Sequence, residues 1–282
     1  MPDIWGLAAI ATKFALYLGI MTAAGAVMTA LFFRLERYRG LAAGFAVIGL
    51  LATLTVFGLR AINLTGDLSG LTDPVMLGLL WSTPVGTALA LRLGGLAILL
   101  VGLCMGRIGL WVSVVGGIVA IWSFDHVGHV SDRSTTLLDI ALTVHLLVVA
   151  LWIGILTPLY RLASATGSYR QAVDVGHRFG IVASIAVPAL IAAGVYMGYE
   201  LVGSLGALFG TTYGLALIAK VIVVGLLLSL AAANKLRFMP ALKRGDIVAA
   251  GKLTKSIAAE WLCVLAILAI TAALTTNFKL PT

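Results

Sequence analysis

Long apolar stretches alternate with short polar ones along the whole chain, and this alternation is the dominant pattern of the sequence. A helix needs about 20 residues to cross the hydrocarbon core of a bilayer. Eight stretches approach or exceed this length, at residues 4–33, 41–63, 84–105, 107–124, 137–160, 176–201, 213–236 and 254–276. Because backbone groups in lipid must bond within their own segment, we predict that all eight are helices.

A shorter apolar stretch at residues 71–81 lies between the second and third of these segments. It is too short to cross a bilayer, and we predict a surface or re-entrant helix there. The pattern therefore predicts an all-α, polytopic membrane helix bundle of about eight transmembrane helices, forming a single integral membrane domain over residues 1–282.

Composition supports an exterior that faces the lipid bilayer. Of the 282 residues, 61% are hydrophobic and only 11% are charged, whereas a soluble domain has roughly a quarter of its residues charged. The net charge of +8 is compatible with nucleic acid, but the bases stand in short runs between apolar stretches, so we expect no nucleic-acid partner. Cys104 and Cys263 lie far apart in apolar segments, which excludes a CxxC redox motif.

Charges in the connections predict the orientation of the bundle. With eight helices, the basic connections all fall on one side: Arg34, Arg37, Arg39, Arg107, Arg161, Arg170, Arg178, Lys235, Arg237, Lys243, Arg244, Lys252 and Lys255. Acidic residues dominate the other side: Asp67, Asp73, Asp125, Asp132, Asp139 and Glu200. Basic residues favour the cytoplasmic side, so we predict that both termini are periplasmic.

Histidines gather on the predicted periplasmic side. His126 and His129 have the i, i+3 spacing of one helical face, and His145 lies within the fifth predicted helix. Imidazoles from two segments could bind copper or zinc, and Met76 and Met197 could add thioether ligands. The alternative interpretation is that the first two histidines are solvated, His145 bonds between helices, and both methionines are packing residues.

Charged side chains also occur inside the predicted helices. Lys13, Arg92 and Lys220 lie in the outer halves of their helices, where a charge costs about 2.5–3.5 kcal/mol unless it finds a partner or reaches the interface. Three interpretations remain open. The bases could form ion pairs that fix helix packing, support a polar cavity whose carboxylates attract a cation, or bind an anion such as haem propionates. The carboxylates available on this side include Asp67, Asp125, Asp139 and Glu200.

Two further residues are candidates in the bundle interior. Glu260 lies in the inner half of the last predicted helix, where it could relay protons or pair with a base such as Lys255 or Arg178. Trp152 follows His145 by seven positions, on the same helical face, so we expect both to line the same interior surface.

Several short motifs resemble those of the bacterial copper resistance protein CopD family. Gly128-His129, followed by His145, Trp152 and Gly154, is similar to the Gly-His and His-x6-Trp-x-Gly signatures of that family. The resemblance extends over nearly the whole chain through Arg60, Gly66-Asp67, Thr83-Pro84, Arg92, Arg178-Phe179, Tyr213-Gly214, Lys220, Asn234-Lys235, Pro240, Ser256 and Glu260. The chain departs from the family pattern in having Ile155 after Gly154, where a second glycine is frequent.

The resemblance implies a copper transport protein of the bacterial inner membrane that imports copper ion. It implies His129 and His145 as copper ligands, with His126, Met76 and Met197 as additional candidates. No copper-binding domain of the CopC type is fused to the chain, so a separate periplasmic partner of that type is expected. Arg92, Lys220 and Glu260 match family positions without a role that follows from the sequence.

Two other functions remain open at this stage. The first is a haem-binding redox or electron-transfer protein, with paired histidines on the iron. The second is a receptor that docks a copper chaperone without transport. No nucleotide-binding loop is present, so we expect no direct use of ATP. A copper transporter would not be an enzyme, and a redox enzyme is the alternative. The sequence leaves open the copper oxidation state, the energy coupling and the oligomeric state.

Overall fold

The computed structural model describes residues 4–106, 108–128, 135–278 and 280, and the part of the chain that it describes is all-α. Within it, eight helices are long and apolar enough to cross a membrane, as predicted. The elements in chain order are α1 (Ile4–Phe33), α2 (Arg39–Thr65), the 3₁₀-helix η1 (Leu68–Leu71), α3 (Pro74–Trp81), α4 (Pro84–Cys104), α5 (Gly109–Trp122), the 3₁₀-helix η2 (Ser123–His126), α6 (Thr136–Ser164), α7 (Tyr169–Val202), α8 (Leu205–Gly210), α9 (Thr212–Ala233), the π-helix η4 (Asn234–Phe238), α10 (Met239–Lys243) and α11 (Ile247–Asn277).

Capping residues determine where several helices begin. Asp73 accepts hydrogen bonds from the backbone N–H groups of Val75 and Met76, and Pro74 occupies the first helical position, so α3 begins there. Asp246 caps α11 in the same way, through the N–H of Val248. The result is that α11 begins at Ile247, several residues before the predicted segment 254–276. A helix that leaves the bilayer can continue through charged residues, because water solvates them.

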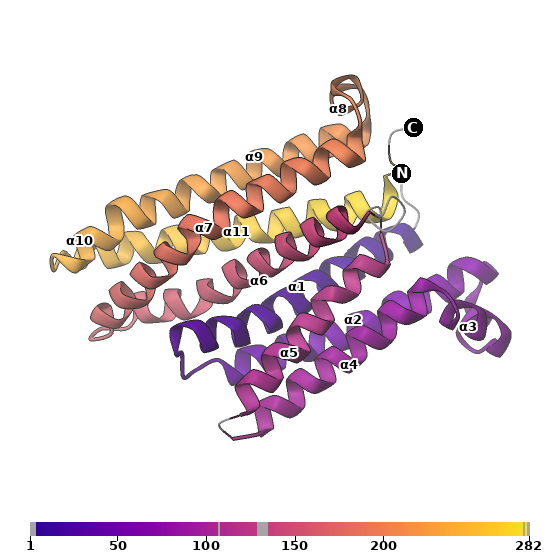
Figure 1. Cartoon of the computed structure of the whole chain (residues 1–282), viewed down its shortest axis with the longest axis horizontal. Coiled ribbons are helices and arrows are strands. Elements are labelled where there is room, and N and C mark those ends of the chain that lie inside the picture. The colour runs from indigo at the N-terminus through magenta and orange to yellow at the C-terminus, as the bar shows by residue number, and fades with distance from the viewer. Residues whose placement is uncertain (1–3, 107, 129–134, 279, 281–282) are drawn as a thin grey trace.

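Helix α1 forms the centre of the bundle, and most of its apolar stretch is buried inside the protein. It packs on α2 and α5 on one side and on α6 and α11 on the other (Figure 1). The pair α4 and α5 closes one flank. On the other flank, α7 packs mainly on α6 and α9 packs mainly on α11.

The closest approach of α1 to α6 occurs at two glycines. A Cβ atom on Gly154 would lie far inside van der Waals contact with the backbone of Gly25, and a Cβ atom on Gly25 would overlap the carbonyl group of Ala150. Pro158 has no N–H to donate to the Gly154 carbonyl one turn earlier. The hydroxyl of Thr29, whose shortest hydrogen bond is to the carbonyl of Gly25 at 2.8 Å, also lies 3.3 Å from the carbonyl oxygen of Gly154. The two helices are therefore close enough for a side chain of α1 to reach the backbone of α6.

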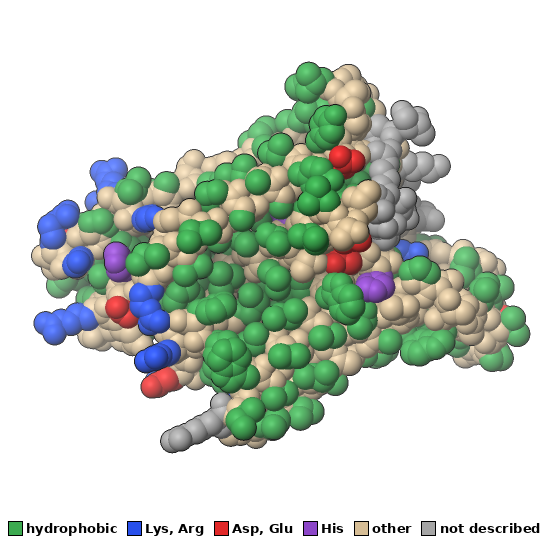
Figure 2. Space-filling model, viewed as in Figure 1, with side chains coloured by type: hydrophobic (Ala, Val, Ile, Leu, Met, Phe, Trp, Pro, Cys, Tyr) green, Lys and Arg blue, Asp and Glu red, His purple; other side chains and the backbone are tan. Residues whose placement is uncertain are grey.

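Charge is distributed unequally between the two ends of the bundle. Figure 2 shows basic side chains gathered at the end where α10 lies, and acidic side chains beside a histidine towards the opposite end. Helix α1 begins and α11 ends at this second end (Figure 1). That arrangement agrees with the segregation of charge in the sequence, and the periplasmic location of this end remains a prediction from the positive-inside rule.

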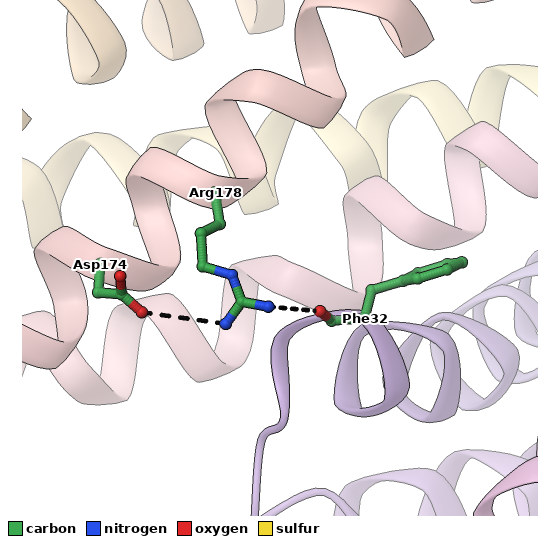
Figure 3. Close-up of polar contacts among 3 residues, drawn as sticks. All are labelled: Phe32, Asp174 and Arg178. Carbon is green, nitrogen blue, oxygen red and sulfur yellow. Dashed lines mark hydrogen bonds and ion pairs between the residues drawn. The ribbon is translucent and has the colours of Figure 1, made fainter.

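At the basic end, Arg178 joins α7 to the last turn of α1. Its Nη2 atom donates to the carbonyl oxygen of Phe32 at 2.9 Å, and its Nη1 atom lies 3.9 Å from Asp174 (Figure 3). The guanidinium also lies 5.9 Å from the centre of the Phe33 ring. A cation at a helix C-terminus is favourable, because the last carbonyl groups of the helix lack partners within it.

We expect Arg178→Gln to lower the free energy of unfolding by about 1–2 kcal/mol, because it removes a charge-assisted hydrogen bond to the end of α1. Unfolding of the purified protein by graded addition of denaturing detergent would measure the change. Arg237→Gln, an exposed base in η4, is the matched control and should unfold like the wild type. Equal effects of the two substitutions would contradict this role of Arg178.

Candidate functional site

Four polar side chains meet at the end of the bundle where α1 begins, and we call them the Asp–His cluster: Asp125, His126, Asp139 and Thr143. Asp125 and His126 stand in η2, and the other two lie one turn apart on α6. The hydroxyl of Thr143 donates to Oδ2 of Asp125 at 2.6 Å, which joins η2 to α6. The ring of His126 packs edge-on against Trp122, with centroids 5.4 Å apart.

Three atoms of this cluster are buried and have no hydrogen-bond partner among the described residues: Oδ1 of Asp125, Nδ1 of His126 and Oδ1 of Asp139. The two carboxyl groups are close enough for their charges to interact. Leaving a buried polar atom unpaired costs about 1–3 kcal/mol, so the cluster can gain stability from a bound cation. Across the described residues, however, no group of three or more His, Cys, Asp or Glu side chains is arranged to hold a metal ion.

His129, predicted as a ligand from the resemblance, lies outside the described residues. It follows His126 by three positions, so the Asp–His cluster adjoins it in sequence. Its placement and that of Asp132 remain untested.

His145 lies on a different face of α6 from Asp139 and Thr143. Its ring lies beside Gly194 on α7 and near the Leu190 backbone, and it is close enough to Lys220 on α9 for their charges to interact. Its Nδ1 atom is buried without a partner among the described residues. The structure therefore brings His145 together with Lys220, whereas His126 packs on α5, so a site that uses both histidines stays a prediction.

The two methionine candidates lie in different surroundings. Met76 is half-buried on α3, a helix that packs on α2 and α4 rather than on α6. Met197 is buried on α7 in an apolar cluster with Leu138 and Leu201. For Met197 these neighbours favour the packing interpretation.

The two remaining predicted carboxylates, Asp67 and Glu200, do not belong to the Asp–His cluster. Asp67 is exposed and caps η1 by accepting from the backbone N–H of Ser69 at 2.7 Å. The hydrogen bonds from Ser69 hold the pKa of Asp67 below its usual range, as expected for a capping carboxylate. Glu200 is half-buried near the end of α7.

Two of the basic residues inside the bundle, Arg92 and Lys13, form hydrogen bonds to neutral groups. Arg92 is only 6% exposed, donates from Nε to the hydroxyl of Ser123 at 3.0 Å, and places its guanidinium 4.7 Å from the centre of the Phe124 ring. The ammonium of Lys13 donates to the carbonyl oxygen of Thr275. Neither base pairs with an acid among the described residues, so the bonds seen here are not the ion pairs of the first of the three interpretations.

Glu260 forms the centre of a second polar group, in the half of the bundle near the basic end. The indole Nε1 of Trp152 donates to its Oε2 at 3.2 Å, and the side-chain amide of Asn234 donates to its Oε1. The ion pairs with Lys255 or Arg178 that the sequence suggested are absent among the described residues. We call Trp152, Asn234 and Glu260 the inner triad.

Asn234 is the functional candidate that the sequence reasoning left without a role. Two signals were available in the sequence: an amide within an apolar helix, and Pro240 shortly after it. A proline removes a backbone donor from the helix, and the structure has the π-helical turn η4 in this place.

Two family models match the chain. Residues 1–138 match the model described as "Copper resistance protein D-like, N-terminal domain", and residues 173–274 match the model described as "Copper resistance protein D". No curated protein and no solved structure matches at a significant level. The first match includes Asp125 and His126 of the Asp–His cluster, and the second includes Asn234 and Glu260 of the inner triad.

Proposed function

Because the chain belongs to the CopD family of copper resistance proteins, we propose that it moves copper ion across the bacterial inner membrane, from the periplasm to the cytoplasm. The family and the eight apolar helices make it a multi-pass membrane protein with a copper-related function. No element of the proposal requires enzymatic chemistry, because copper is the cargo rather than a resident cofactor.

The observation that supports the entry point is the set of unpartnered atoms in the Asp–His cluster. Two carboxylate oxygens and one imidazole nitrogen are buried without partners among the described residues, at the end of the bundle opposite to the basic side chains. By the positive-inside rule the basic end faces the cytoplasm, so the cluster faces the periplasm. Its negative charge then attracts a cation that arrives from that side.

The donor atoms of the cluster favour the oxidised form of copper. Imidazole nitrogen and carboxylate oxygen suit Cu(II), whereas Cu(I) prefers sulfur. His129 adjoins the cluster in sequence and is the second imidazole of the proposed entry region, and His145 lies further along α6 as the next candidate ligand. A periplasmic copper-binding protein of the CopC type would deliver the ion to this end.

Copper uptake into proteoliposomes tests this assignment. We expect His126→Ala and Asp125→Asn each to reduce uptake at low copper concentration by about tenfold, because each removes a proposed ligand atom. His177→Ala is the matched control, since His177 is an exposed histidine of α7 near the basic end, and its uptake should equal that of the wild type. Unchanged uptake in both cluster variants would contradict the proposed entry site.

Two measurements on the same preparations separate the alternative functions. The optical spectrum of the purified protein would show a Soret band if the chain binds haem, and our proposal expects none. Copper that binds to proteoliposomes without entering their lumen would indicate a docking receptor instead of a transporter.

A further inference from the structure

A cavity of about 340 Å³ lies among α6, α7, α9, η4 and α11, in the half of the bundle that contains Glu260. Its lining includes Trp152, Phe179, Pro188, Asn234 and Glu260, and most of the rest is aliphatic. Pockets for small molecules in proteins begin at about 300 Å³ and are mostly apolar with a few placed polar groups. Both the size and the lining therefore fit a small-molecule site.

The polar end of the cavity is the inner triad, and each of its members is almost completely buried. Glu260 is 3% exposed, Trp152 is 6% exposed and Asn234 is 7% exposed. Both oxygens of Glu260 already accept a hydrogen bond, one from the indole and one from the amide. The carboxyl group is therefore held in a fixed position against the cavity.

The triad leaves one acceptor for a ligand. The amide nitrogen of Asn234 donates to Glu260 in the structure, so the amide oxygen points elsewhere. This oxygen, Oδ1, is buried and has no partner among the described residues, and it belongs to a residue that lines the cavity. A ligand with an O–H or N–H group would supply the missing donor.

Aromatic side chains surround the same region. The rings of Trp152 and Phe179, which both line the cavity, pack edge to face with centroids 5.5 Å apart and an interplanar angle of 79°. An aromatic ring packed against this pair gains from both stacked and edge-on contacts. The ligand that fits best therefore carries its O–H or N–H group on an aromatic ring.

The cavity has a side towards the lipid, between α7 and α9. The ammonium of Lys235 bridges this side by donating to the carbonyl oxygen of Gly180 at 2.9 Å and to the hydroxyl of Ser184 at 2.7 Å. Lys235 and Ser184 are both exposed. Further along α9, Val221 and Leu226 expose apolar side chains, so an apolar tail that leaves the cavity and extends along this helix would meet the hydrocarbon of the bilayer.

Irregular helix geometry widens this part of the bundle. The π-helical turn η4 begins at Asn234, and such turns within helices occur frequently at functional sites. Pro188 in α7 lines the cavity and removes one backbone hydrogen bond from its helix. These two features lie on the two helices that flank the opening.

We propose that this cavity binds a membrane-soluble phenol or quinol. Its hydroxyl group donates to Oδ1 of Asn234, its ring packs against Trp152 and Phe179, and its apolar tail passes between α7 and α9 into the lipid. The site is distinct from the Asp–His cluster and does not depend on the transport of copper.

Saturable binding of a tritium-labelled, decyl-substituted benzoquinol to the protein in nanodiscs tests the proposal, with protein-free nanodiscs as the background. We expect Asn234→Leu to weaken binding about tenfold, as the loss of one hydrogen bond would. Ala183→Phe, which places a ring in the cavity lining, should abolish saturable binding. Ala219→Phe, on an exposed position of α9 outside the cavity, is the matched control and should bind like the wild type.

The dimethyl ether of the same probe provides the second comparison, because it keeps the apolar body and lacks the donor. We expect it to bind the wild type about tenfold more weakly than the quinol. This comparison needs no substitution, so it remains decisive if Asn234→Leu fails to fold. Equal binding of the ether and the quinol, or unchanged binding in Ala183→Phe, would overturn the proposal.

Discussion

Gly154→Leu should prevent α1 from packing on α6 and leave the protein unable to form its bundle. Any Cβ atom at this position overlaps the backbone of Gly25, and backbone cannot move aside as a flexible side chain can. Helix α1 lies at the centre of the bundle, so its displacement also disturbs its packing on α2, α5 and α11. We expect a loss of more than about 4 kcal/mol, in the range that overpacking of a core produces at its most severe.

Size-exclusion chromatography and thermal unfolding in mild detergent would show this effect as aggregation or a large fall in the unfolding temperature. Gly44→Leu is the matched control, because Gly44 is also helical but has no atoms near its potential Cβ. The control should be as stable as the wild type, since leucine has the higher helix propensity. A Gly154→Leu protein that elutes and unfolds like the control would refute the close packing of these two helices.

The second large effect is expected at the inner triad. Glu260→Leu removes the only acceptor that the structure provides, among the described residues, for the indole of Trp152 and the side-chain N–H of Asn234. Both donors would remain buried without partners, at a cost of about 1–3 kcal/mol each. We expect the free energy of unfolding to fall by about 2–6 kcal/mol.

Glu260→Gln separates the hydrogen bonds from the size of the side chain. Glutamine keeps one acceptor oxygen, so this variant should lose about half as much stability as the leucine variant. Glu36→Leu, which removes an exposed carboxylate at the basic end, should leave the unfolding free energy nearly unchanged. If Glu260→Leu were as stable as Glu36→Leu, the inner triad would contribute nothing to the fold.

The fold could be predicted from the sequence to a large extent because hydropathy is a local property. Each crossing helix needs only its own run of apolar residues, and the eight predicted runs correspond to eight helices in the described structure. The predicted starts were late at the basic end, where α7 begins at Tyr169 rather than residue 176. Charged residues there ended the apolar run, whereas the helix itself continues. The six-residue helix α8 was too short to give a periodic signal.

The candidate site was harder to predict because it depends on contacts between distant segments. Periodicity correctly placed Thr143 and His145 on the same helix, but only the packing of α6 decides that Thr143 faces Asp125 and that His145 faces Lys220. The bond between Trp152 and Glu260 joins positions separated by 108 residues. The sequence selected both as interior residues, yet it suggested a basic partner for Glu260 because it contains no information on which neutral donors lie nearby.

The central position of α1 has a consequence for biosynthesis. Ribosomes deliver α1 to the membrane before α6 and α11 have been made, yet its glycine crossing requires α6, and Lys13 donates to a carbonyl group near the end of α11. During translation the ammonium of Lys13 therefore has to stay hydrated at the membrane surface or in the insertion machinery. The core of this protein closes only after α11 has entered the membrane, so the helices cannot complete their packing one by one in the order in which they are made.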